Sequence, residues 1–221
     1  VLYLLSTPPI YTRTAAILVK DNSKSSSSTS AMNDFSDLGI FKSNTNINNE
    51  LLTLKSPTLM TEVVNRLGLN ETFTIRKGLK NVDLYKVSPV TITFCDKIEV
   101  PLSFTIKFSS KEAFAISELE ISGEDIGETL SAQMGDSIQT SAGIMIVSPT
   151  QEFTDAFIGT SIRYVRGSVR AAVDTYSNAL VAELGNEDAT IINLSINDTS
   201  IRKAEDILNT LIEVYNENWI R

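Results

Sequence analysis

The sequence has 221 residues, of which 42% are hydrophobic and 21% charged, so it is long and apolar enough to bury a globular core. Its formal net charge of −8 argues against a nucleic-acid partner and against flat binding to an anionic membrane, because both need basic surface. The sequence contains no histidine, which excludes Ser-His-Asp and Cys-His catalysis and imidazole metal ligands.

The chain opens on an apolar run, Val1 to Leu5, which ends before Pro8-Pro9. Five residues are far fewer than the roughly twenty that cross a bilayer. On composition alone the run is either the last turns of a longer membrane helix or a buried first strand. After the prolines, "IYTRTAAILVK" predicts a strand, and its continuous apolar residues at 17–19 are typical of a strand covered on both faces.

Two helices are expected after a Ser-rich loop at residues 21–39. The first covers about Asn48 to Lys55. Ser56 then caps a second helix with Pro57 at its first position, and Gly68 ends it. Apolar residues repeat at helical spacing in the second helix, so one of its faces must be buried; they are Leu59, Met60, Val63, Val64 and Leu67.

From Thr72 to Pro149 the hydrophobic period changes to two, which predicts many short strands. The candidates are "TFTIRK", "PVTITFC", "PLSFTIKF", "AFAISELEI", "SIQT" and "GIMIV", separated by turns that contain glycine. This pattern favours an antiparallel meander or a small barrel. Cys95 cannot form an internal disulfide as the lone cysteine, and its apolar setting predicts an inert buried thiol.

The last third of the chain returns to a mixed pattern. It predicts a strand at "TSIRYVRG", a helix at "SVRAAVDTYSNAL", strands at "VAEL" and "TIINLSIN", and a final helix from about Thr199 that Asp198 caps. The predicted fold class is therefore α/β (α+β), with a mixed sheet packed against helices. The α/β core is expected at residues 11–71 and 150–221, and a β-rich insertion at 72–149.

Motifs that carry chemistry are missing from the sequence: there is no phosphate loop, no G-x-G-x-x-G and no C-x-x-C. We therefore predict no catalytic residue, no cofactor and no metal. The acidic pairs at 124–125 and 187–188 are interpreted as solvated turn charge. Arg163, Arg166 and Arg170 recur near a strand–helix junction and are candidates for an anion site, a subunit contact or an ordinary exposed face.

Segments near both ends of the sequence follow recognisable patterns. After "STPPIYTRTAAILVK", residues Glu50 to Leu69 match E-x-x-x-L-x-S-x-x-L-M-x-x-V-V-x-x-L-x-L, and near the other end residues Ala204 to Tyr215 match A-x-x-I-L-N-x-L-I-x-x-Y. In these patterns the sequence resembles the periplasmic domain of the chain-length determinant (Wzz) family of polysaccharide co-polymerases, which includes Wzc-like bacterial tyrosine-protein kinases of capsule and exopolysaccharide clusters. "VDLYKVSPV" resembles a segment of Bacteroidetes-like members. Ile201 departs from the family, where a proline is common.

The resemblance implies that residues 1–10 are the end and exit of a first transmembrane helix. It implies a domain in the periplasm, anchored in the inner membrane, that forms ring-like homo-oligomers and regulates capsule, exopolysaccharide or O-antigen chain length or export. Its partners would be a polysaccharide polymerase or the growing glycan, and a cytoplasmic tyrosine kinase domain would lie outside this sequence. The fragment itself is then not an enzyme.

The expected oligomer or packing contacts lie on the two motif helices and at the arginines, namely Leu59, Val63, Leu211, Tyr215, Trp219, Arg163, Arg166 and Arg170. An alternative function is an extracytoplasmic carbohydrate-binding or adhesin-like module built on the β-rich middle. A third hypothesis is a glycosidase that uses two carboxylates, but no residues in the sequence mark such a pair.

Overall fold

The computed structural model describes residues 8–19, 40–96, 100–185 and 191–219, with side chains from residue 47 onward in the second range and up to residue 218 in the last. Its contacts divide the chain into two compact units. Of the described residues, the α/β unit comprises 11–19, 40–67, 173–185 and 191–219, and the β unit comprises 8–10, 68–96 and 100–172. Segments on both sides of the middle therefore build one unit, and the middle builds most of the other.

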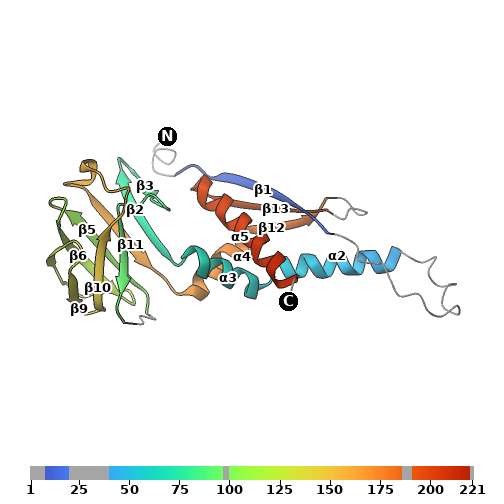
Figure 1. Cartoon of the computed structure of the whole chain (residues 1–221), viewed down its shortest axis with the longest axis horizontal. Coiled ribbons are helices and arrows are strands. Elements are labelled where there is room, and N and C mark those ends of the chain that lie inside the picture. Colours follow the sequence, from blue (N-terminus) through green and yellow to red (C-terminus); the bar gives the residue numbers. More distant parts are fainter. Residues whose placement is uncertain (1–7, 20–39, 97–99, 186–190, 220–221) are drawn as a thin grey trace. The chain divides into compact units, whose positions relative to one another are not determined.

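The α/β unit contains a three-stranded antiparallel sheet in the order β1-β13-β12 (Figure 1). Its strands are β1 (Tyr11–Leu18), β12 (Leu180–Leu184) and β13 (Ile191–Asp198). In the central strand β13, Ile192, Leu194 and Ile196 are buried, while Asn193 and Asn197 between them are exposed. This alternation means that helices cover one face of the sheet and leave the other open.

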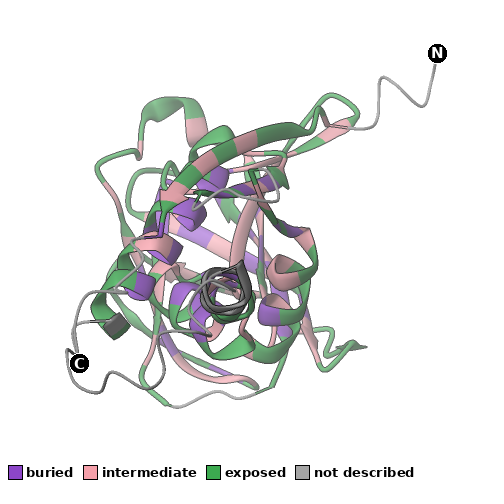
Figure 2. Ribbon diagram, turned by 90° about the vertical axis from the view of Figure 1, so that its right-hand side faces the viewer, coloured by how far each residue is buried: buried purple, intermediate pink, exposed green. Residues whose placement is uncertain are grey.

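Three helices of the α/β unit pack together, and α2 and α5 also contact the sheet. They are α2 (Ile40–Leu54), α3 (Pro57–Leu67) and α5 (Ile201–Trp219). α5 contacts α2, α3, β1 and β13, so it is the central helix of this layer. A fourth helix, α4 (Val169–Ala179), leads directly into β12. In Figure 2, buried segments alternate with exposed ones along the ribbons, as amphipathic elements require.

The β unit is built from two antiparallel sheets. A seven-stranded sheet has the order β3-β2-β11-β5-β6-β7, with β8 also paired to β6, and a three-stranded sheet has the order β4-β10-β9. The strands are β2 (Glu71–Lys77), β3 (Lys80–Asp83), β4 (Val90–Phe94), β5 (Leu102–Phe108), β6 (Ala113–Ile121), β7 (Glu124–Asp125), β8 (Leu130–Gln133), β9 (Ser137–Thr140), β10 (Gly143–Pro149) and β11 (Ser161–Arg166). A short 3-10 helix, η2 (Asp155–Phe157), precedes β11.

One hydrophobic core lies between these two sheets. Strands of the larger sheet contribute Phe104, Ile106 and Phe114, and the smaller sheet contributes Met145 and Val147, all at most 1% exposed. Because alternate residues of each strand enter this core, the opposite face of the larger sheet carries mainly polar side chains.

A β-bulge shapes that polar face. The register of β5 with β6 shifts between the pairs Ser103↔Glu120 and Thr105↔Ser117, so two residues of β6 lie opposite one of β5. Glu118 in the bulge has φ of 53°, in the left-handed region. The extra residue lets Ile116 and Leu119, three positions apart, both face the core. Glu118 and Glu120 therefore lie on the polar face, where both contact β5 side chains.

The α/β class, with helices on a sheet and a β-rich middle, is confirmed. Each pair of described strands is antiparallel, whereas we expected a mixed sheet, and the described strands of the middle form two sheets rather than a small barrel. β11 was assigned to the α/β core from the sequence, yet it pairs with β2 and β5 and belongs to the β unit. Three short strands, β3, β7 and β8, were not predicted.

Candidate functional site

The first motif segment forms the end of α2 and the whole of α3. Ser56 caps α3, with its Oγ 3.2 Å from the Leu59 N–H, as the sequence predicts. Leu59 and Val63 are 3% and 0% exposed and face the interior of the α/β unit. They are therefore packing residues in this chain, and their side chains do not reach its surface.

The second motif segment forms the buried stripe of α5, which packs against α3. Leu211 and Tyr215 are 0% and 5% exposed, so they too pack in the interior of the unit. The side chain of Trp219 lies outside the described residues. Of the five apolar residues that the sequence singled out, four are thus placed, and all four lie in the core of the unit.

Polar contacts connect the two motif segments. The Tyr215 hydroxyl donates a hydrogen bond of 2.7 Å to Glu50 Oε2. Arg66 at the end of α3 donates to both carboxylate oxygens of Glu217 on α5, at 3.0 and 2.6 Å, and to Glu62 on its own helix at 2.8 Å. The contact of Tyr215 with Glu50 joins α5 to α2, and that of Arg66 with Glu217 joins α3 to α5, each at one defined position along the helices.

The start of α5 is built around a buried ion pair. Lys203 Nζ lies 3.4 Å from Asp198 Oδ2, and both side chains are 10% exposed. Asp198 was predicted to cap α5, but Ser200 has that role, because its Oγ accepts from the Lys203 N–H at 3.3 Å. Asp198 acts one step earlier and accepts from the Ser200 N–H at 2.7 Å. The pair thereby fixes the turn from β13 into α5.

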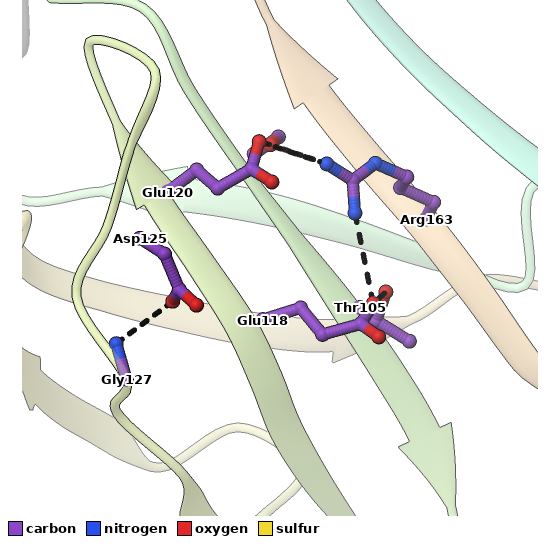
Figure 3. Close-up of polar contacts among 7 residues, drawn as sticks. Thr105, Glu118, Glu120, Asp125, Gly127 and Arg163 are labelled. Atoms are coloured by element: carbon purple, nitrogen blue, oxygen red, sulfur yellow. Dashed lines mark hydrogen bonds and ion pairs between the residues drawn. The ribbon is translucent and has the colours of Figure 1, made fainter.

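Arg163 is held by side chains on the polar face of the larger sheet (Figure 3). Its Nη2 donates to Glu120 Oε2 at 3.0 Å and to Ser103 Oγ at 2.9 Å, and its Nη1 lies 3.6 Å from Glu118 Oε2. Thr105 Oγ1 also donates to Glu118 Oε2, at 2.7 Å. Glu118 and Glu120 therefore compensate the charge of Arg163 within the β unit.

The other two arginines differ from each other. Arg166 lies 3.8 Å from Glu71 across the β11–β2 pair, and its guanidinium carbon is 5.1 Å from the centre of the Phe94 ring. Arg170 is exposed on α4. The three residues do not converge on one point, so they do not form an anion site in this chain.

Tyr164, between Arg163 and Arg166 in β11, is the largest fully buried side chain of the protein's described part. Its ring packs against Phe73 and Phe104, with centroids 5.0 Å away in each case. Burial raises the pKa of its phenol well above the usual range, and the carboxylate of Glu71 adds to the shift. The phenol therefore stays neutral and takes no part in acid–base chemistry near neutral pH.

The open face of the α/β sheet contains a hollow of about 460 Å³. All three strands line it with small or polar side chains, among them Thr14, Ala16, Val181, Glu183, Asn193 and Ser195. Leu18 on β1 is 63% exposed and Val181 on β12 is 43% exposed, so apolar side chains lie on both edge strands of this face. This is the one surface of the unit where the described helices do not cover the sheet.

Chemical sites are not evident elsewhere in the described ranges. They contain no group of three acidic or cysteine ligands that could hold a metal, and no helix in them is long and apolar enough to cross a membrane. Residues Val1–Leu5, in which the end of a membrane helix was predicted, lie outside those ranges. Glu124 and Asp125 are exposed, and Asp125 accepts from the Gly127 N–H at 2.8 Å in an ordinary turn (Figure 3).

Cys95 is exposed, so the prediction of a buried thiol was wrong. It follows the last residue of β4, where the chain leaves the sheet, and the apolar residues before it gave no sign of that end. Sugar rings usually stack on exposed aromatic faces, but every described aromatic side chain of the β unit is at least partly buried. Tyr85 and Phe94 are both in this class.

Comparisons with known proteins leave the family open. No protein-family profile and no curated protein matches the sequence. Two crystal forms of Xanthomonas campestris FlgL align with 67% of this chain at 16% identity, with TM-scores of 0.18 and 0.17. The alignment covers 45% of the FlgL chain, less than half its length. A likeness this low bears on neither fold nor function.

Proposed function

We propose that this chain is the periplasmic domain of a membrane-anchored polysaccharide co-polymerase, which regulates the length or export of capsule, exopolysaccharide or O-antigen through homo-oligomerisation. The observation that supports this most is the hydrogen bond from Tyr215 to Glu50. Glu50 is the first residue of one motif segment and Tyr215 is the last of the other. Two segments that resemble one family separately thus meet in one folded unit.

The buried residues of both segments support the same proposal. Positions of the family pattern that are apolar in this sequence fill the interior of the α/β unit, including Leu54, Met60 and Val64 in the first segment and Ala204, Ile207 and Leu208 in the second. A chance resemblance would not need to place its matched residues in contact. The intervening β unit is then an insertion between two halves of the domain that the motifs specify.

In this proposal the domain acts by assembly and catalyses no reaction itself. Flanking helices would anchor it in the inner membrane, facing the periplasm, and in a kinase member a cytoplasmic tyrosine kinase domain would follow. Its partners are further copies of itself, the polysaccharide polymerase and the growing glycan. The carbohydrate-binding alternative has less support, because the described β unit offers no exposed aromatic face for a sugar.

Genetic deletion in the host tests the proposal. Surface polysaccharide separated on a gel should lose its preferred length range, or fall in amount, and the wild-type gene should restore it. A matched complementation uses Tyr215→Leu, which disrupts the contact between the motifs, beside Glu213→Ala at an exposed position of the same helix. We expect Glu213→Ala to restore the length distribution and Tyr215→Leu to fail. Unchanged length and amount of every surface polysaccharide after deletion would refute the proposal.

A further inference from the structure

We propose that neighbouring copies in the oligomer join through the edges of the α/β sheet, with β1 of one copy lying beside β12 of the next. The sheet would then continue from copy to copy. This inference rests on the proposed function, because it assumes that the copies stand side by side in one membrane. It adds the surface by which they associate.

Strand direction is the first argument. In the order β1-β13-β12 both neighbours are antiparallel, so β1 and β12 run in the same direction. Copies related by an axis normal to a shared membrane keep one orientation, so β1 of one copy can lie parallel to β12 of the next with the helices on the same face. A contact between two β1 strands closes at two copies instead. A β1-to-β12 contact is heterologous and can close into a ring.

The quality of the β1 edge is the second argument. All eight residues of β1 pair with β13 in one unbroken register, with no bulge. The strand contains no proline, no glycine and no lysine, and its single charge, Arg13, is held by Glu205 at 2.8 Å. Natural proteins usually protect an exposed edge strand with a bulge, a proline or an exposed charge such as lysine, and β1 has none of these. Among the described residues no strand pairs with the outer edge of β1 or of β12, so both remain open to strand addition.

Side-chain complementarity is the third argument. On the open face, β1 presents Thr14 and Ala16, which are small, and the exposed Leu18. β12 presents the exposed Val181 and one charge, Glu183. Placing the strands side by side brings the apolar residues onto one surface and sets Glu183 against a neutral edge. No like charges meet, which matters for a chain that carries −8.

Disulfide trapping on vesicles tests this geometry. The chain is made with Cys95→Ser and an N-terminal histidine tag, and is tethered to vesicles that contain nickel-chelating lipid, so that all copies share one orientation. Cysteine pairs combine Thr14→Cys or Ala16→Cys with Val181→Cys or Glu183→Cys, since the register between copies decides which pair meets. Thr14 and Val181 of one chain both lie opposite Ser195. They are therefore two strand spacings apart, roughly 9.5 Å, too far for an internal disulfide.

The expected result is a ladder of dimers, trimers and larger species on a non-reducing gel for at least one double variant. A mixture of the two matching single variants should give dimers alone, and neither single variant should cross-link by itself. Efficient dimers of Thr14→Cys alone would show a contact between two β1 strands and overturn the inference.

Energy transfer between copies separates this inference from the proposed function. Donor and acceptor dyes on the exposed Cys95 report association of tethered chains without regard to the surface used. Ala16→Lys, at the edge, should weaken that association at least tenfold, whereas Asn193→Lys, on the same face of the central strand, should not. If energy transfer persists while no cysteine pair cross-links and Ala16→Lys has no effect, the edge contact is wrong and the proposed oligomer stands. If tethered chains show no energy transfer at all, both fall.

Discussion

Tyr215 and Glu50 are 165 positions apart in the sequence, and the Tyr215 hydroxyl donates a 2.7 Å hydrogen bond to Glu50 Oε2. Tyr215 is 5% exposed and Glu50 is partly exposed, so the bond is partly shielded from water. We expect Tyr215→Phe to lower the free energy of unfolding by about 1.5–3 kcal/mol, the range for a hydrogen bond to a charged group. Urea unfolding followed by circular dichroism measures the change.

A double-mutant cycle with Glu50→Ala isolates the contact. Tyr215→Phe removes the donor of the hydrogen bond and Glu50→Ala removes its acceptor, so each single variant abolishes the interaction. The two effects should not add, with an interaction energy of about 0.5–3 kcal/mol for residues in contact. Additive effects would mean that the hydrogen bond contributes nothing to the packing of α2 against α5.

The buried pair at the start of α5 predicts an asymmetric response. Lys203→Met leaves the Asp198 carboxylate without its cation, and breaking a buried ion pair in this way typically costs about 3–5 kcal/mol. Adding Asp198→Asn removes the stranded charge and keeps an oxygen that accepts from the Ser200 N–H. The double variant should therefore be more stable than Lys203→Met alone. Thermal melting of the three chains checks the order, and a double variant less stable than Lys203→Met would contradict it.

Arg163 was predicted from the sequence as a contact between subunits, and that stays a prediction, but the structure gives it a role within one copy. Removing its guanidinium leaves Glu118 and Glu120 side by side without a cation. We expect Arg163→Ala to lower the free energy of unfolding by about 1 kcal/mol, because the group is partly exposed and water screens the pair. Arg163→Lys should recover part of the loss.

The same variant also tests the subunit role. Energy transfer between vesicle-tethered copies should be the same for Arg163→Ala as for the wild-type chain if the arginine serves its own sheet. A loss of association in Arg163→Ala without a matching loss of stability would place this residue in the subunit contact after all.

Periodicity made much of the fold predictable. Leu59, Met60, Val63 and Val64 recur at helical spacing, and all four are buried in α3. The predicted strands of the middle are present because alternation of apolar and polar residues needs no tertiary information. By contrast, β7 has only two residues, too few for a period to be recognised, and β3 has a single apolar residue, Val82, so no alternation marks it.

The sequence could not predict which strands pair with each other. "TSIRYVRG" has the same strand pattern whichever sheet it joins, and its pairing with β2 and β5 is decided by contacts distant in the chain. The same holds for the arginine that this segment contains. Its charge is visible in the sequence, but the bulge that brings Glu118 and Glu120 to its side is set by the register of β5 with β6. The apolar residues before Cys95 likewise led to the wrong prediction of a buried thiol. Its exposure depends on where β4 ends, which those residues do not indicate.

The buried phenol of Tyr164 should make the free energy of unfolding depend on pH in the alkaline range. Its hydroxyl is buried without a hydrogen-bond partner among the described residues, and burial followed by the Glu71 charge raises its pKa. In the unfolded chain the same phenol ionises near pH 10. Above that pH the unfolded state loses a proton that the folded state keeps, so this group's contribution to stability is present below pH 10 and is lost as the pH rises further.

Tyr164→Phe should abolish that dependence. Between about pH 10 and 11.5 the free energy of unfolding of the wild-type chain should fall more steeply than that of the variant, by up to about 1.4 kcal/mol per pH unit for one proton. At pH 7 the variant should be at least as stable as the wild type, because it loses a buried hydroxyl that has no partner. Urea unfolding at a series of pH values gives both slopes. Parallel slopes would mean that the Tyr164 phenol ionises as readily in the folded chain as in the unfolded one, against its burial.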